Sequence, residues 1–251
     1  MNRDLSPFLN NWPFDPTDIC ARKIRGRDGH EKLQVRLDLG VLQMELCDRP
    51  DGVRPYGHPS LLDYYLDCLE THRAKHGTDS SFRLDVDACG ELGQEGLLFY
   101  HRYICLLRLG DFDGVVHDTT HNLAILDLVK SYAENEEDRH SFEQYRPYVL
   151  MIHTRGKGEL CLLNGDYTGA LKRIEEGMAK IKAGVAGLED IIDPEEELQA
   201  LSTWADEIGR DQPMSVEQQL VQELQTAIAE ERYEQAARLR DRLRSLEKTK
   251  S

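Results

Sequence analysis

Two loops near the amino end contain the side chains best suited to bind a ligand. Arginines, histidines and glycines gather in residues 22–32 (RKIRGRDGHEK) and again in residues 48–58 (DRPDGVRPYGH). A guanidinium donates two parallel hydrogen bonds to a carboxylate or phosphate, so clustered arginines are typical of an anion site. The residues predicted to line such a ligand-binding or enzymatic pocket are Arg25, Arg27, Arg49, Arg54 and His58.

A structural role is the alternative for the same arginines. They could pair with Asp28, Asp38 or Asp48, while Asp51-Gly52 forms an ordinary turn. Backbone groups and helix ends would then use the donors that an anion needs. The sequence leaves both interpretations open.

The other sequence patterns that could indicate a catalytic or metal site are weak. His117 and His121 (HDTTH) stand four residues apart, which places two rings on one helix face, and His72 and His76 have the same spacing. No third ligand is indicated, so no metal is expected. The sequence also contains no phosphate-binding Gly-x-x-x-x-Gly-Lys-Ser/Thr loop and no Gly-x-Ser-x-Gly elbow. We therefore predict a protein without a cofactor and without enzymatic activity.

The composition argues against direct, strong binding to nucleic acid. The 251 residues carry a formal net charge of -15, with 40% apolar and 31% charged residues. Non-specific nucleic-acid affinity comes mainly from neutralising phosphates with Lys and Arg, which this balance opposes. The six cysteines form no Cys-x-x-Cys pair, and neither a secretory leader nor a membrane-spanning apolar run is present. We expect reduced thiols and a cytoplasmic location.

Turn residues divide the body of the chain into helical pairs. Gly110-Asp111-Phe112 separates two segments of helical periodicity, 91–109 and 113–132. Gly165-Asp166-Tyr167 separates a segment that ends at Leu163 from residues 168–182. An earlier pair is predicted from residues 33–46 and 59–74. The alternation of Leu33, Val35 and Leu37 also suits a strand, but the segment that follows favours a helix.

These pairs resemble irregular tetratricopeptide-type helical repeats. The best unit is the third, in which Gly158 and Ala170 occupy the small positions of the repeat and lie at a predicted close crossing of helices. The units are spaced further apart than the roughly 34 residues of a regular array. The resemblance implies an all-α fold, a right-handed superhelix of stacked hairpins that together make a continuous core.

The predicted organisation has four parts. Residues 1–20 form an extended tail that lies across a helical surface, and residues 21–185 form the repeat body. Residues 186–213 form a bridging helix and a hinge, since Asp193-Pro194 is a strong helix start. Residues 214–251 form a separate two-helix hairpin.

The carboxy-terminal hairpin is the segment best suited to bind a partner. Two amphipathic helices meet near Glu231, with Tyr233 covering the turn and two alanines allowing close approach. A hairpin of this length buries too little surface to be self-sufficient, so its apolar stripe is expected to remain open. The predicted contact residues are Leu220, Leu224, Ile228, Tyr233, Ala236, Ala237, Leu239, Arg240 and Leu243.

The order of residues in this hairpin resembles the UVR motif of the bacterial excision-repair proteins UvrB and UvrC. The matching run, ERYEQAARLRDRLRSL at residues 231–246, has the pattern aromatic-Glu-x-Ala-Ala-x-x-Arg-Asp. It departs at Arg232, where the family more often has an acid. The resemblance implies a contact module through which like hairpins pair, on another protein or on a second copy in a homodimer.

We therefore expect a non-enzymatic scaffold or adaptor that docks a protein partner through the hairpin. One alternative is a ligand-binding or enzymatic domain that uses the arginine-rich loops. Another is an accessory factor in DNA excision repair of the UvrB and UvrC type.

Overall fold

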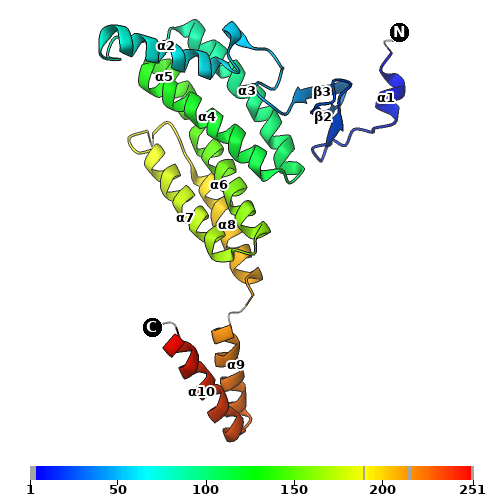
Figure 1. Ribbon diagram of the computed structural model, residues 1–251, viewed down its shortest axis with the longest axis vertical. Helices are drawn as coiled ribbons and strands as arrows, with labels where there is room; N and C mark the ends of the chain where they lie inside the picture. The colour runs from blue at the N-terminus through cyan, green and yellow to red at the C-terminus, as the bar shows by residue number, and fades with distance from the viewer. Residues whose placement is uncertain (1–3, 189, 214–215, 250–251) are drawn as a thin grey trace. The chain divides into compact units, whose positions relative to one another are not determined.

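The computed structural model describes residues 4–188, 190–213 and 216–249. Helices dominate this part of the chain, so the predicted all-α class is confirmed apart from one small sheet. The chain divides into two compact units, one ending at Ala205 and one beginning at Asp206. Figure 1 shows the order of the elements along the chain.

The first unit contains a sheet followed by a series of helices. The long helices pack in sequence, α3 on α4, α4 on α6 and α6 on α7 (Figure 1). The helices are α1 (Ser6–Asn10), α2 (Leu61–His76), α3 (Val86–Arg108), α4 (Phe112–Tyr132), α5 (Glu136–Glu143), α6 (Arg146–Leu163), α7 (Tyr167–Gly184) and α8 (Glu195–Asp211), the last of which continues past Ala205; a 3-10 turn, η1, spans Pro55–Gly57.

The two Gly-Asp-aromatic turns between helices are formed as predicted. Gly110 and Gly165 have φ angles of 72° and 71°, a left-handed conformation that glycine adopts without a steric cost. Asp111 donates its backbone N–H to the Leu106 carbonyl at 2.9 Å, five residues back, which is the bond that closes a Schellman motif. The Asp111 side chain then accepts the Gly114 N–H and caps α4. The same few residues thus end one helix and begin the next.

The helix predicted over residues 33–46 is wrong, because this segment forms part of a sheet. Strands β1 (Ala21–Arg25), β2 (Glu31–Leu37) and β3 (Gly40–Glu45) make an antiparallel meander. Leu37 pairs with Gly40, which leaves Asp38 and Leu39 as a two-residue hairpin loop. Leu39, assigned to the core face of the predicted helix, is 90% exposed. The apolar residues alternate with a period of two residues, as in a strand, and this period, not the helical period of 3.6, places their side chains in the core.

The sheet packs its apolar side chains against the helices of the same unit. Leu33, Val35 and Met44 are buried in one cluster with side chains from α3, α4 and α6. Because residues 33–46 are strands, the first of the three predicted helical pairs does not form. The second and third pairs correspond to α3 with α4 and α6 with α7. The short helix α5 between them was not predicted.

The amino-terminal tail packs on the sheet and is not fully extended. Asp4 accepts the Ser6 N–H at 2.9 Å and begins the one-turn helix α1, which the extended prediction missed. Arg36 of β2 donates to the Trp12 carbonyl at 2.8 Å. The guanidinium of Arg22 in β1 lies 3.8 Å from the centroid of the Trp12 ring. Trp12 thus packs on a cation of the sheet, while Asp18 of the same tail accepts two hydrogen bonds from Arg108 of α3.

Glycines on α6 and α7 allow close contact between helices. A Cβ at Gly158 would lie 2.9 Å from Cζ3 of Trp204 in α8, and one at Gly177 would lie 2.6 Å from Cγ2 of Thr154. The close approach predicted at Gly158 thus accommodates the indole of Trp204, over which the Arg155 guanidinium stacks. Ala170, the other predicted small position, is completely buried in α7.

A buried histidine lies between α4 and α6. Nδ1 of His153 is 2.9 Å from the hydroxyl of Thr119, and both side chains are buried. Burial, together with the nearby cations Lys157 and Lys180, lowers the pKa of His153 to about 4. The native protein therefore holds this imidazole in its neutral form.

Burial also keeps two of the thiols protonated. Cys89 and Cys105 are buried, and burial raises the pKa of each to about 11. Cys47 is exposed, and Cys20, Cys68 and Cys161 are partly buried. All six cysteines are free.

We expect Gly158→Ala to lower the free energy of unfolding by about 1 to 3 kcal/mol, because the added methyl would overlap the Trp204 ring. Gly209→Ala is the matched control, since Gly209 is an exposed glycine of α8 with nothing within 4 Å of its Cβ position. That control should be neutral or stabilising by up to about 1 kcal/mol. Urea unfolding of the two variants measures both effects. A stabilised Gly158→Ala protein would contradict the close packing.

We expect the neutral His153 to make the fold sensitive to acid. The unfolded histidine takes up a proton near its ordinary pKa of 6.5, whereas the native one does so only near 4. Stability is therefore fully present above pH 6.5 and is lost as the pH falls from 6.5 to 4. His153→Gln removes this loss while keeping a polar group beside Thr119. Urea unfolding at pH 7 and pH 4.5 should show that the free energy of unfolding falls less for the variant than for the wild-type protein. An equal fall in both proteins would contradict the neutral state assigned to His153.

Candidate functional site

A buried carboxylate on α3 fixes the start of α2. Glu95 is fully buried and accepts the backbone N–H groups of Leu61 at 2.7 Å and Leu62 at 3.0 Å. Its other contacts are His121 at 3.1 Å and Arg49 at 3.4 Å. Burial acts to raise the pKa of Glu95, but the hydrogen bonds from His121 and the two amides outweigh it and lower that pKa. The charge lies at the positive end of the α2 dipole, where an anion is stabilising.

A buried arginine on α3 holds the loop that follows β3. Arg102 makes two hydrogen bonds of 2.7 Å to the carboxylate of Asp118 in α4. Its remaining terminal nitrogen donates to the carbonyls of Glu45 and Asp48, at 2.9 and 2.8 Å. Arg102 and Asp118 are both 1% exposed. This pair is thus fully used in joining α3, α4 and the loop.

Three of the four arginines predicted to bind an anion donate to protein acceptors. Arg25 donates to the Gly29 carbonyl within its own turn, and Arg54 pairs with Asp48 at 2.7 Å. Arg49 pairs with Asp51 in addition to Glu95. Arg27 is exposed on the β1–β2 turn, and His58 packs against the edge of the Tyr64 ring. The contacts favour the structural role, and the anion site stays a prediction.

His117 and His121 contact different partners, whereas the rings of His72 and His76 lie together with centroids 4.4 Å apart. His117 contacts Asp118 at 2.9 Å, whereas His121 stacks on Phe99 with ring centroids 3.7 Å apart and reaches Glu95. The contact with Asp118 raises the pKa of His117. His72 is 3.0 Å from the hydroxyl of Ser81. Within the described residues, no group of three metal-ligating side chains comes together.

The second unit contains a helical hairpin that closes on itself. It consists of α9 (Val216–Ala229) and α10 (Tyr233–Thr249), which pack on each other. The alanines Ala227 and Ala236 are buried where the helices meet, between Leu220 and Leu239. Arg232 donates its backbone N–H to the Ala227 carbonyl at 2.7 Å, and Glu231 turns the chain with a φ of 58°. Of the two alanines predicted to permit close approach, Ala236 is buried at this contact and Ala237 is exposed.

The open apolar surface of the hairpin differs from the predicted stripe. Leu220 and Leu239 are buried within the hairpin, with Leu224 and Leu243 partly buried beside them. Other predicted contact residues lie outside this core: Ala237 and Arg240 are exposed, and Tyr233 is 68% exposed and so does not cover the turn. Among the hairpin side chains that the structure describes, the large exposed apolar ones are Val221, Ile228 and Tyr233. The side chains of Val216 and Leu246, which the pattern adds to the stripe, lie outside the described residues.

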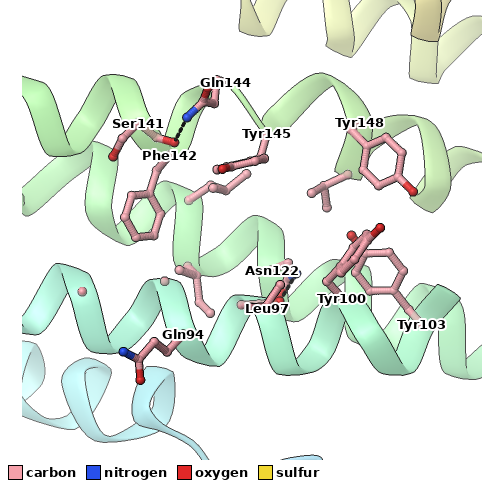
Figure 2. Close-up of a pocket in the computed structure, with 16 residues that line it drawn as sticks. Gln94, Leu97, Tyr100, Tyr103, Asn122, Ser141, Phe142, Gln144, Tyr145 and Tyr148 are labelled. Atoms are coloured by element: carbon pink, nitrogen blue, oxygen red, sulfur yellow. Dashed lines mark hydrogen bonds between the residues drawn. The ribbon is translucent and has the colours of Figure 1, made fainter. Parts of the chain in front are cut away.

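A pocket of about 690 Å³ between α3, α4 and the α5–α6 segment was not predicted. Figure 2 shows Tyr100 and Tyr103 of α3 near Tyr148 of α6, with Phe142 of α5 further along. The sequence carries one sign of it, the glycines Gly90, Gly93 and Gly96 at three-residue spacing on α3. All three glycines line the pocket, so the absence of their side chains adds to its volume.

The comparisons with known proteins identify the hairpin. The sequence model described as "UvrB/uvrC motif" matches residues 218–249, which cover most of α9 and α10. The resemblance predicted from the residue pattern is therefore confirmed for the hairpin. No curated protein and no solved structure matches the chain. In the described part of the chain, no helix is both long and apolar enough to cross a membrane.

We expect Arg102→Met to lower the free energy of unfolding by about 3 to 5 kcal/mol, because it leaves the Asp118 carboxylate buried without its cation. The double variant Arg102→Met/Asp118→Leu removes both charges and should recover part of that loss. Recovery is partial because the carbonyls of Glu45 and Asp48 lose their donor. Urea unfolding measures all three proteins. A double variant less stable than Arg102→Met would contradict this pairing.

Proposed function

We propose that this chain is a non-enzymatic adaptor that binds a protein partner through its UVR-like hairpin. The partner is another hairpin of the same kind, on a second copy or on a different protein. The observation that carries the proposal is the match of residues 218–249 to the UvrB/uvrC motif. The exposed apolar residues of the hairpin and its separation as a compact unit support it.

The apolar side chains of α9 form an edge that a second helix can cover. Val221 and Ile228 are 40% and 53% exposed and lie seven residues apart, hence on one face. Leu224 lies between them and is only partly buried by α10. This spacing is the one by which helices pack side by side along an apolar seam. The hairpin core is already closed, so a partner would add to the fold without being needed to complete it.

The charges of the two helices favour pairing of like with like. Exposed arginines are concentrated on α10, at positions 238, 240, 242 and 244, whereas α9 and the turn carry exposed Glu223, Glu230 and Glu231. Two such hairpins related by a two-fold axis can place the basic helix of each near the acids of the other. A UVR-type hairpin on another protein offers the same complementarity.

The identity of the partner distinguishes the adaptor from an excision-repair accessory. The net charge of -15 argues against direct binding of DNA, so a repair role would act through a UvrB-like or UvrC-like hairpin. The helical body would in either case carry the hairpin. The arginine-rich loops contribute to that body through Glu95 and Asp48, which supports a structural and not an enzymatic part for them.

We expect Ile228→Asp to weaken hairpin-mediated association at least ten-fold, because burying an isoleucine contributes roughly 1.5 to 3 kcal/mol. Sedimentation velocity of the full-length protein over a concentration series measures self-association. The same protein mixed with a full-length UvrB-type protein measures heterologous pairing. Gln222→Asp, an equal charge at an exposed polar position of α9, is the matched control and should leave both unchanged.

Thermal unfolding of both variants checks that the hairpin remains folded. A wild-type chain that stays monomeric and binds no UVR hairpin would overturn the proposal. So would association that Ile228→Asp leaves intact, since the contact would then lie elsewhere on the chain.

A further inference from the structure

The pocket beside α3 has the size and lining of a small-molecule site. Its volume of about 690 Å³ lies within the range of ligand pockets, roughly 300 to 1,000 Å³. Five aromatic side chains line it, and three of its apolar residues, Leu97, Tyr100 and Tyr145, are among the large exposed hydrophobic residues of the chain. The rim is therefore open while the floor is buried. Figure 2 shows these side chains gathered from α3 and from the α5–α6 segment.

A buried hydrogen-bond acceptor lies in the floor of this pocket. The side chain of Asn122 in α4 is 7% exposed and lines the pocket. Its Nδ2 donates to the Gly96 carbonyl at 2.9 Å, but its Oδ1 receives no hydrogen bond from the described residues. Leaving such an acceptor buried and unpaired is costly, by an amount comparable to a lost hydrogen bond. Oδ1 itself is closed to solvent, so the side chains over it must shift before a donor that enters the pocket can reach it and remove this cost.

The Tyr103 hydroxyl is the protein group that could compete for the same amide. The Asn122 amide acts to lower the pKa of Tyr103, but burial raises that pKa much further, so the phenol stays protonated. A hydrogen bond of ordinary geometry from this hydroxyl to Oδ1 is not formed.

The lining contains no charged side chain. Its polar members are amides, hydroxyls and phenols, namely Gln94, Gln144, Ser141, Asn122 and the tyrosines. Burial and the neighbouring Tyr100 raise the pKa of Tyr148 to about 12, so this phenol is also neutral. An ion placed here would lose its hydration without gaining a partner of opposite charge. The pocket thus selects against charged ligands.

Glycine positions keep the pocket open. A Cβ at Gly96 would lie 3.8 Å from Oδ1 of Asn122, and one at Gly90 would have nothing within 4 Å. A Cβ at Gly96 therefore meets no backbone atom, and a larger side chain at this position would occupy pocket volume beside Asn122. Gly93 is closer to its neighbour, with Phe142 at 3.3 Å from its Cβ position.

We propose that this pocket binds a neutral, mainly aromatic small molecule that donates one N–H or O–H hydrogen bond to Oδ1 of Asn122. The aromatic body packs among Tyr100, Phe142 and Tyr148, where offset and edge-on ring contacts add to simple burial. The donor reaches the amide in the floor. This site is separate from the hairpin and does not depend on the partner proposed for it.

The test uses full-length protein and two fluorescent probes that differ by one methyl group. N-phenyl-1-naphthylamine is neutral and aromatic and has a single N–H, whereas its N-methyl derivative lacks the donor. We expect the first probe to bind the wild-type protein about three- to ten-fold more tightly, as one hydrogen bond to a buried neutral acceptor allows. In Asn122→Leu the two probes should bind with equal affinity.

Occlusion of the pocket locates the bound probe. Gly96→Leu should weaken binding of both probes at least ten-fold, whereas Gly209→Leu, at an exposed helical glycine outside the pocket, should leave it unchanged. Thermal unfolding confirms that each variant is folded. Equal binding of the two probes to wild-type protein would mean that the acceptor is already satisfied and would overturn the proposal.

Two further outcomes would also overturn it. Probe affinity that Gly96→Leu does not change would place the probe elsewhere on the protein. The bound probe can also be displaced by two competitors, a tryptophan-containing dodecapeptide and N-acetyltryptophanamide. If the peptide displaces the probe at a much lower concentration, the pocket binds a side chain of a protein partner. Comparable displacement by the two compounds supports a small-molecule site.

Discussion

Two buried charges on α3 fix the amino-terminal unit. Glu95 and Arg102 lie seven residues apart, so they project from the same side of the helix. Glu95 holds the first amides of α2, and Arg102 holds Asp118 together with the carbonyls at the end of β3. Neither charge is tolerable in a protein interior without such partners. The positions of the sheet, the loop and α2 therefore follow from satisfying these two side chains.

This constraint explains why the polar loops near the amino end do not present a free set of cations. Arg49 extends the network around Glu95, and Arg54 pairs with Asp48, whose carbonyl accepts from Arg102. A guanidinium that already donates to carboxylates and carbonyls has fewer donors left for a ligand. Arg49 donates to Glu95 of α3 from the loop after β3, and Arg102 of α3 donates to carbonyls at the end of β3 and in the same loop, so these contacts join the sheet to the helical body.

The surfaces suited to recognition lie in other places and differ in chemistry. The hairpin closes its own core with small residues and leaves an edge of Val221, Ile228 and Tyr233 beside exposed charges, a combination that suits a protein surface. The pocket beside α3 is concave, aromatic and without charge, with one unpaired acceptor in its floor. An apolar edge beside exposed charges and a neutral aromatic cavity favour different kinds of ligand.

The sequence alone determined the features that depend on residues a few positions apart. The Gly-Asp turns, the paired helices around them and the buried Ala236 of the hairpin were predicted because their contacts close within one or two helical turns. Residues 33–46 were assigned wrongly, since a short apolar run fits both periods and only packing against α3 decides between them. The partners of Arg102, which lie in distant segments, and the pocket at Asn122 could not be predicted either. Buried charges and cavities are set by segments far apart in the chain, and only the tertiary structure brings those segments together.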